Sequence, residues 1–411
     1  MRMDYHPRII ESKLAELVRH FPVVTVTGAR QTGKSTLIQH LFGASHRTVV
    51  FDPHLDLAGA RQDPDFFLQN HPPPLFLDEV QYAPELLGAI KRKVDQDGQN
   101  GQYILSGSQH LAVTKGVVES LAGRSAVVQL HPLCWRELQK ETARPAFLRS
   151  WLADERPQLS ALPEPTIPVT RLIWRGMHPR LIELPDPMTR AYWESYLQTY
   201  VERDIRSVAD VGSLQTFGRF ISLLAAHTAS EVNQNQLGRE LGVDRTTAVR
   251  WTEVAEATFQ WISVPAYSRN AGKRIAGRRK GFFTDAGFVC HLQRIPSPEA
   301  LPGHPLFGAL FESWVVMEIL KSFQEWPVAP ALWHYRTYAG AEVDVILEYN
   351  GRLFPIEIKA TAAPAPRDLA GIQSFRECFP RAAIGPGLLV CAVAEPRQLP
   401  GEVLAIPWWA L

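Results

Sequence analysis

The sequence contains few cysteines and no long hydrophobic run. Only 4 of its 411 residues are cysteine, and they lie far apart without a Cys-x-x-Cys pair, which argues against a zinc site and against a disulfide framework. No stretch of about 18 apolar residues occurs and no apolar signal-peptide segment opens the chain, so we expect neither membrane spanning nor secretion. The simplest location for such a chain is the reducing cytoplasm.

The chain also lacks an excess of charge of either sign. It has 43 Lys and Arg against 42 Asp and Glu, a formal net charge of +1. The total charge therefore does not argue for nucleic-acid binding, and any such case must rest on local clusters. Hydrophobic residues make up 45% of the chain, which suits the roughly two to four domains that its length predicts at about 100–200 residues each.

Residues 28–35 read GARQTGKS and have the spacing of a complete phosphate-binding loop. The loop follows a β-branched strand pattern at 23–27 and precedes a helical pattern, which is the context that the motif requires. Lys34 is expected to reach the β- and γ-phosphates of a nucleoside triphosphate, and Ser35 to bind Mg²⁺. The expected nucleotide-contacting residues are Gly28, Ala29, Arg30, Gln31, Thr32, Gly33, Lys34, Ser35 and Thr36.

A second apolar strand, at 74–77, ends in two carboxylates. Asp78 is expected to hold Mg²⁺, directly or through water, and Glu79 to polarise the attacking water. A third strand, at 103–105, leads to Ser108, our candidate γ-phosphate sensor, with Ser106 as its substitute. Strand patterns alternate with helical patterns up to about residue 150, which predicts a parallel α/β core.

The middle of the chain begins with a proline-rich stretch at about 155–187, which has the composition of a linker with little regular structure. Tyr192, Tyr196 and Tyr200 then recur every fourth residue, and this spacing favours a core-facing stripe over base stacking. We divide the chain into an N-terminal domain (1–150), a linker with a helical segment (151–215), a winged-helix domain (216–300) and a C-terminal domain (301–411).

Residues 235–259 have a helix-turn-helix pattern, with a turn at Gly242 and an N-cap at Asp244. Basic residues follow among glycines, as in the wing of a winged helix. The candidate DNA contacts are Arg245, Thr246, Arg250, Lys273, Arg274, Arg278, Arg279 and Lys280. A protein-packing module with a solvated basic loop fits the same pattern, so both interpretations stay open here.

Asn350 and Gly351 form the preferred pair for a two-residue hairpin turn. Tyr349 then faces Arg352, and continuing this register places the apolar side chains of both strands on one face. The same register puts Asp344 opposite Glu357 on the other face.

Two acids held about 5 Å apart across strands repel each other, and a divalent cation would remove that cost. With Lys359, this is the pattern of PD-(D/E)XK nucleases, and Glu312 is the candidate for a further acid. A surface hairpin with a charged face is the alternative, and a nuclease fold without activity is also open.

The whole chain resembles a bacterial and archaeal family of AAA-type P-loop ATPases with a C-terminal domain of uncharacterised function. The resemblance rests on GARQTGKSTL (28–37), FLDEVQ (76–81), YILSGSQ (103–109), LAGR (121–124), HPLCWREL (131–138), YVERDI (200–205), GFFTDAGF (281–288), EVDVI and IEIKA. It implies an ATPase core, a winged-helix middle region and a C-terminal α/β domain like a restriction endonuclease, with ATP as the nucleotide and a ring or other homo-oligomer. Arg124 is similar to a family arginine that approaches a nucleotide, and a salt-bridged structural arginine is the equal alternative.

The leading hypothesis is an ATP- and Mg²⁺-dependent hydrolase that remodels or processes DNA in repair, recombination or defence. The competing hypothesis is a signalling or assembly ATPase whose C-terminal domains bind a protein partner. Turnover that depends on DNA would favour the first, and turnover indifferent to DNA the second.

Overall fold

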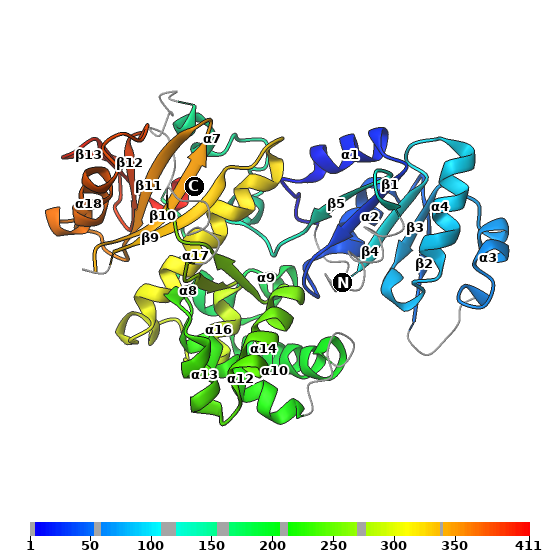
Figure 1. Cartoon of the computed structure of the whole chain (residues 1–411), viewed down its shortest axis with the longest axis horizontal. Coiled ribbons are helices and arrows are strands. Elements are labelled where there is room, and N and C mark those ends of the chain that lie inside the picture. The colour runs from blue at the N-terminus through cyan, green and yellow to red at the C-terminus, as the bar shows by residue number, and fades with distance from the viewer. Residues whose placement is uncertain are drawn as a thin grey trace.

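The computed structural model describes residues 5–52, 59–107, 121–153, 164–205, 213–268, 277–337 and 340–411. They form an N-terminal unit, a largely helical central unit and a C-terminal unit built on a second large sheet (Figure 1). Within these described ranges no helix is both long enough and apolar enough to cross a bilayer.

The N-terminal unit is built on a five-stranded, fully parallel sheet in the order β2-β3-β4-β1-β5. Its strands are β1 (Val23–Thr27), β2 (Arg47–Val50), β3 (Leu75–Asp78), β4 (Tyr103–Gly107) and β5 (Ser125–Gln129). The inner strand β1, between β4 and β5, is buried along its whole length, as its β-branched sequence predicts for a strand covered on both faces. The predicted parallel α/β core is confirmed.

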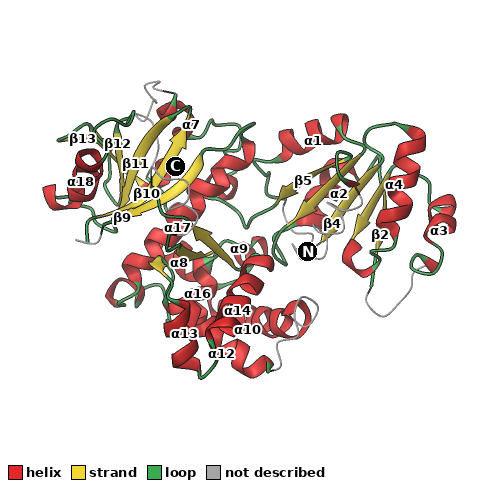
Figure 2. Cartoon of the chain, in the orientation of Figure 1, coloured by secondary structure: helices red, strands yellow, loops and turns green. Residues whose placement is uncertain are grey.

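Helices cover both faces of this sheet, as Figure 2 shows. The helices are α1 (Glu11–His20), α2 (Lys34–Phe42), α3 (Pro64–Asn70) and α4 (Leu86–Asp97), with a short 3-10 turn η2 (Val80–Tyr82) after β3. One apolar cluster joins α1 and α2 to Val24 and Val26, and another joins α3 and α4 to Val23 and Leu77. Alternate side chains of the strands thus enter two separate cores.

The central unit begins with short helices and continues into a small antiparallel sheet in the order β6-β8-β7. Its elements are α6 (Trp135–Leu138), α7 (Phe147–Leu152), α8 (Val169–Arg175), α9 (Pro179–Glu183), η3 (Asp186–Met188), α10 (Thr189–Thr199), the π-helix η4 (Tyr200–Ile205), α12 (Leu214–Ala226), β6 (Ser230–Glu231), α13 (Gln234–Leu241), α14 (Arg245–Ala257), β7 (Trp261–Val264), β8 (Lys280–Phe283) and α16 (Ala286–Leu292). Gly242 ends α13 with φ 73°, and the Asp244 side chain caps α14 by accepting a 2.8 Å bond from Thr247 N. The predicted two helices and their cap are therefore present.

The linker interpretation of residues 155–187 is wrong for the part that the structure describes, from residue 164 onward. Pro168 is the N-cap of α8 and Pro179 is the first residue of α9, so these prolines start helices instead of preventing them. Leu172, Ile173 and Leu181 of the two helices are buried. Proline content alone could not distinguish a helix start from a linker.

The C-terminal unit contains α17 (Phe307–Ser322) and a six-stranded mixed sheet in the order β13-β14-β12-β11-β10-β9. Its other elements are η5 (Leu301–Gly303), η6 (Phe323–Glu325), β9 (Ala331–Arg336), β10 (Glu342–Tyr349), β11 (Arg352–Ile358), η7 (Pro366–Leu369), α18 (Ala370–Cys378), β12 (Gly387–Cys391), β13 (Arg397–Leu399), β14 (Val403–Pro407) and η8 (Trp408–Ala410). The helix α17 lies near the middle of the molecule (Figure 1) and is buried along most of its length.

The predicted hairpin register is confirmed. Tyr349 pairs with Arg352 and Val345 with Ile356, and the turn residues Asn350 and Gly351 have φ values of 49° and 73°. These positive values match the turn type that an Asn-Gly pair favours. The apolar face of the hairpin joins the large core that the central and C-terminal units share.

Candidate functional site

The loop after β1 has the backbone of an anion-binding turn at the start of a helix. Gly28 has φ 141°, and a Cβ at this position would lie 2.2 Å from the carbonyl oxygen of Leu130, so no other residue fits. Gly33 adopts φ 94° directly before α2, which begins at Lys34. Thr32 Oγ1 donates to Ala29 O at 3.0 Å and closes the loop on itself. The N-terminus of α2 therefore faces the space that the loop encloses.

Lys34 is held over the loop. Its ammonium group donates to the carbonyl oxygens of Gly28 at 3.0 Å and Ala29 at 2.9 Å, and the residue is buried. An ammonium group fixed at the mouth of the loop is placed to exchange these carbonyls for phosphate oxygens.

Two oxygen ligands for a divalent cation meet beside the loop. Ser35 Oγ donates to Asp78 Oδ2 at 2.6 Å, and Ser106 Oγ donates to the other carboxylate oxygen of Asp78. A hydroxyl and a carboxylate in contact are the donor set that Mg²⁺ takes beside a nucleotide, so these residues fit the ion. Ser106, the substitute sensor, is thus in this group, whereas Ser108 lies outside the described residues.

Glu79 follows Asp78 with a left-handed backbone, at φ 57° and ψ 43°. This conformation is uncommon for a residue with a side chain, and such strain concentrates at functional sites. The Glu79 side chain accepts a hydrogen bond from Gln81 Nε2, and its backbone N–H donates to Asp78 Oδ1 at 3.1 Å. The second carboxylate of the motif is therefore fixed next to the one expected to hold the metal.

Arg124 lies at the N-terminal ends of the parallel strands, at the opposite end from the phosphate loop. Its carbonyl oxygen accepts from Val23 N, at the start of β1, whereas the phosphate loop follows the end of β1. Its guanidinium forms an ion pair with Asp95 at the end of α4. The structure therefore does not bring Arg124 to the phosphate loop of its own chain, and it shows the salt bridge of the structural alternative.

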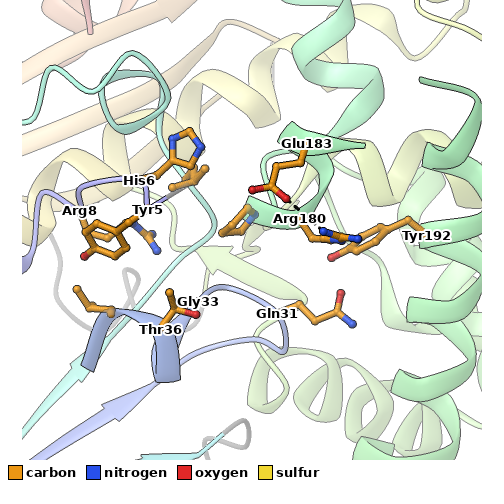
Figure 3. A pocket seen from close by; sticks show the side chains of 12 residues that line it. Tyr5, His6, Arg8, Gln31, Gly33, Thr36, Arg180, Glu183 and Tyr192 are labelled. Atoms are coloured by element: carbon orange, nitrogen blue, oxygen red, sulfur yellow. Dashed lines mark hydrogen bonds and ion pairs between the residues drawn. The ribbon is translucent and has the colours of Figure 1, made fainter. Parts of the chain in front are cut away.

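A cavity of about 400 Å³ opens beside the loop, and the sequence patterns do not reveal it. Figure 3 shows residues from the N-terminal segment, from the loop and from α9 and α10 around it. The lining residues are Tyr5, His6, Arg8, Gln31, Gly33, Thr36, Leu37, Leu133, Pro179, Arg180, Glu183 and Tyr192. Its volume lies in the range of small-molecule sites. No local pattern could have predicted it, because segments that are far apart in the chain meet here.

Tyr192 links this cavity to a buried histidine. The Tyr192 hydroxyl lies 2.7 Å from His178 Nδ1, and burial lowers the pKa of His178 to about 4. His178 is therefore neutral at neutral pH. Of the predicted tyrosine stripe, Tyr196 and Tyr200 are buried in the core, while Tyr192 lines the cavity.

Residues 20–139 match the family described as an AAA domain. They form an AAA-type P-loop ATPase domain. The rest of the chain matches families without a known function: residues 168–299 match the domain of unknown function DUF8612, and residues 307–411 match the domain of unknown function DUF4143.

Two proteins that are similar over most of the chain are described as uncharacterised. The uncharacterised proteins Rv2008c of Mycobacterium tuberculosis and Mb2031c of Mycobacterium bovis are each 26% identical over 355 residues, or 86% of this chain and 74% of theirs. The solved structure of the Walker-type ATPase PABY2304 of Pyrococcus abyssi is 14% identical, with a TM-score of 0.44, over 71% of this chain and all of that one. That TM-score is too low to carry an argument about function.

Far along the chain from the ATPase domain, the predicted C-terminal residues come together around β10 and β11. Lys359 Nζ lies 3.1 Å from Asp344 Oδ2 and 2.9 Å from Glu357 Oε2, and Asp344 also accepts from Ile358 N. Asp344 and Glu357 are buried. We call Glu312, Glu342, Asp344 and Glu357 the carboxylate cluster.

Lys280 enters the carboxylate cluster from β8 of the central unit. Its ammonium lies 2.6 Å from Glu312 Oε1, 2.6 Å from Glu342 Oε1 and 3.3 Å from Asp344 Oδ1, and its side chain is 3% exposed. The prediction that Lys280 contacts DNA is therefore wrong, because its charge is buried among carboxylates. The sequence pattern had placed Lys280 among the basic wing residues, as a candidate DNA contact.

The surroundings shift the pKa values of the carboxylates in this cluster in different directions. Burial, together with the nearby Asp344 charge, raises the pKa of Glu312 to about 8, and burial also raises the pKa of Glu357. Burial acts to raise the pKa of Asp344 as well, but Lys280 and Lys359 hold it below its ordinary value. In the described part of the chain, no group of three or more His, Cys, Asp or Glu residues is arranged to hold a metal ion.

The other candidate DNA contacts divide by position. Arg245, Thr246 and Arg250 are exposed in the first two turns of α14, and Arg278 and Arg279 are exposed directly before β8. Lys273 and Arg274 lie outside the described residues. The structure therefore leaves the helix candidates at the surface and removes only Lys280 from the set.

Proposed function

We propose that this chain is an Mg²⁺-dependent ATP hydrolase that acts on DNA. The contact between Ser35 and Asp78, beside the phosphate loop and next to Glu79, carries the hydrolase part of the proposal. This contact places two oxygen ligands for a cation beside the phosphate loop. The adjacent Glu79 supplies a second carboxylate, which can act on the attacking water.

Each residue of the ATP site has its own role in the proposed hydrolysis. Backbone N–H groups at the start of α2 bind the phosphates, and Lys34 neutralises charge on their β- and γ-oxygens. Ser35 and Asp78 would hold Mg²⁺, which when bound neutralises charge that develops on the phosphate oxygens. Glu79 orients the attacking water and accepts its proton. Ser106 keeps the Asp78 carboxylate in position.

The base and ribose fit the cavity beside the loop. Gln31, Gly33 and Thr36 of the loop line one side of it, and Arg180 and Tyr192 of the central unit line the other (Figure 3). A nucleotide in this cavity would contact both units at once. Its binding and release are thus able to change how the central unit sits on the ATPase domain.

The DNA part of the proposal rests on the surface of α14. Asp244 caps this helix, and its first turns present Arg245 and Thr246 to solvent, while Arg278 and Arg279 are exposed directly before β8 of the small sheet. The order α12, β6, α13, α14, β7 and β8 suits a winged helix, in which the second helix of the pair contacts base edges and basic neighbours contact phosphates.

Steady-state ATP turnover tests this function. We expect turnover of the purified chain to rise when single-stranded, duplex or branched DNA is added, and the effect to fall steeply with salt. Lys34→Ala serves as the blank. Arg245→Ala should reduce the stimulation, whereas Arg190→Ala, an exposed arginine on α10, should not. Turnover that is indifferent to every DNA form would favour the competing signalling or assembly ATPase with a protein partner.

For the C-terminal domain we propose a DNA-holding role without cleavage. Its residues resemble a PD-(D/E)XK site, but Lys280 already pairs with the carboxylates that a divalent cation would need. A metal ion does not fit this arrangement, and no cleavage step follows from it.

Accordingly, Mg²⁺ or Mn²⁺ should not give DNA cleavage by the wild-type chain. Gel electrophoresis of labelled single-stranded and duplex DNA measures this directly. Cleavage that is present in the wild type and lost in Asp344→Ala, with ATP turnover intact, would contradict the proposal and assign a nuclease to the cluster.

A homo-oligomer, in the form of a ring or another assembly, remains part of the proposal. Arg124 lies at the N-terminal ends of the strands, and the phosphate loop of the same chain lies at their C-terminal ends. Any contact of Arg124 with a nucleotide would therefore involve the site of a neighbouring copy. In that case the Asp95 ion pair would have to open on assembly.

A further inference from the structure

Arg8 lies against the phosphate loop, at the wall of the cavity, and is almost completely buried. Its Nη1 donates to Thr32 O at 2.9 Å, its Nη2 to His131 O at 2.6 Å, and its Nε lies 3.0 Å from Glu137 Oε1. We propose that Arg8 is a positioning residue that holds the phosphate loop in its binding shape and ties it to the C-terminal unit. The inference rests on the proposed ATP site.

The geometry of the peptide bond explains how Arg8 acts on phosphate binding. In a planar trans peptide the carbonyl of Thr32 and the N–H of Gly33 point in opposite directions. Because Arg8 holds the Thr32 carbonyl, the Gly33 N–H is directed away from Arg8, and in this proposal it donates to a phosphate on that side. Gly33, at φ 94°, relies on such fixing because its own backbone is permissive.

Glu137 fixes Arg8 in turn. One carboxylate oxygen of Glu137 faces the Arg8 guanidinium and accepts from Ile9 N at 2.9 Å, while the other accepts from Cys134 N at 2.9 Å. Both side chains are at most 3% exposed. Buried ion pairs hold geometry well only when their remaining hydrogen bonds are satisfied, as they are for this carboxylate.

The segment that carries Glu137 is attached to α17 of the C-terminal unit. Trp135 N donates to Glu318 Oε2 at 2.6 Å, and Lys321 Nζ donates to Leu133 O at 2.7 Å while pairing with Glu318 at 3.0 Å. A continuous set of buried contacts therefore runs from the phosphate loop through Arg8 to α17. The same helix carries Glu312 of the carboxylate cluster, so the C-terminal unit supports the shape of the ATP site.

The test compares two nucleotides that differ in the phosphate that the loop holds. Affinities for ADP and AMP are measured by competition against a fluorescent ADP analogue in wild type and Arg8→Lys. Lysine keeps the charge but loses the planar fork that binds two carbonyls and Glu137 together. We expect the ratio of ADP to AMP affinity to fall at least about tenfold. Because Arg8 also lines the cavity, a change in the cavity wall alters both affinities and leaves this ratio unaffected. A general loss of structure would lower both affinities alike.

Arg136→Lys is the matched control. Arg136 is a buried arginine of the same segment that pairs with Glu325 at 2.9 Å and donates to the carbonyl oxygens of Thr142 and Arg144 instead of the phosphate loop. Its replacement should leave the ratio of ADP to AMP affinity unchanged. Glu137→Gln, which leaves Arg8 in place but removes its fixing charge, should lower the ratio in the same direction to a smaller extent, and it serves as the second arm if Arg8→Lys does not fold.

Either of two results would overturn the role of Arg8: an unchanged ratio in Arg8→Lys and in Glu137→Gln, or an equal fall in Arg136→Lys. If the wild type itself shows no preference for ADP over AMP, then the ATP site fails together with this inference. The wild-type measurement thus separates the two failures.

Discussion

Glu79→Gln is expected to bind ATP normally and to lower its turnover by about 100-fold or more, the scale of a lost general base. The substitution removes the proton acceptor while Asp78 and Ser35, which would hold the cation, keep their 2.6 Å contact. The glutamine side chain can still accept the hydrogen bond that Gln81 Nε2 donates to Glu79. Binding and chemistry should therefore separate in this variant.

The measurement is a fluorescent-nucleotide titration together with steady-state phosphate release. Glu85→Gln is the control, because Glu85 is an exposed carboxylate at the start of α4 and six residues away in the same region. It should retain full turnover. Wild-type turnover in Glu79→Gln would show that another group activates the water, and lost binding would show that Glu79 supports the site instead of the chemistry.

Lys280→Met is expected to lower the free energy of unfolding by about 3–5 kcal/mol, the cost of removing one partner from a buried ion pair. Its ammonium group is the buried cation within 3.3 Å of three carboxylates. Without it, Glu312 and Asp344 would face each other across a buried space with too little positive charge. Methionine keeps much of the volume of the lysine stem, so the loss reports mainly on charge.

Urea unfolding measures the loss, and Arg278→Met, an exposed cation two residues before Lys280, is the matched control. The control should change stability little. Adding Glu342→Gln to Lys280→Met should restore part of the loss, because one of the carboxylates that has lost the Lys280 ammonium is then neutral. If Lys280→Met and Arg278→Met are equally stable, the carboxylate cluster does not depend on Lys280. Because β8 belongs to the central unit and the carboxylates to α17 and β10, the experiment also measures how firmly the two units are joined.

Several features were predictable because their causes are local in the chain. The phosphate loop needs glycine at Gly28 and Gly33 for positive φ, and Lys34 follows at once, so the pattern is complete within eight residues. The Asn350 and Gly351 turn fixes the hairpin register, and the register decides which side chains share a face. The register in turn brought Asp344, Glu357 and Lys359 to one place.

Other predictions failed because a neighbour far along the chain decides them. A proline-rich stretch predicts a loop when only the sequence is considered. In the structure, Pro168 and Pro179 start the helices α8 and α9, which pack against the core. Lys280 reads as a surface charge because its carboxylate partners lie more than 30 residues away. Propensity and composition depend on a residue and its neighbours in sequence, so they cannot predict partners that are distant in the chain.

The amino-acid sequence by itself determined the phosphate loop, the Asp78 and Glu79 pair, the alternation that builds a parallel sheet, and the C-terminal hairpin with its register. Only the tertiary structure decided the cavity beside the loop, the burial of Lys280, the end of the strands at which Arg124 lies and the support of the loop by Arg8. The physical reason is the range of the interactions: backbone conformation and side-chain periodicity are set within a few residues, whereas cavities and buried ion pairs arise only when distant segments pack together.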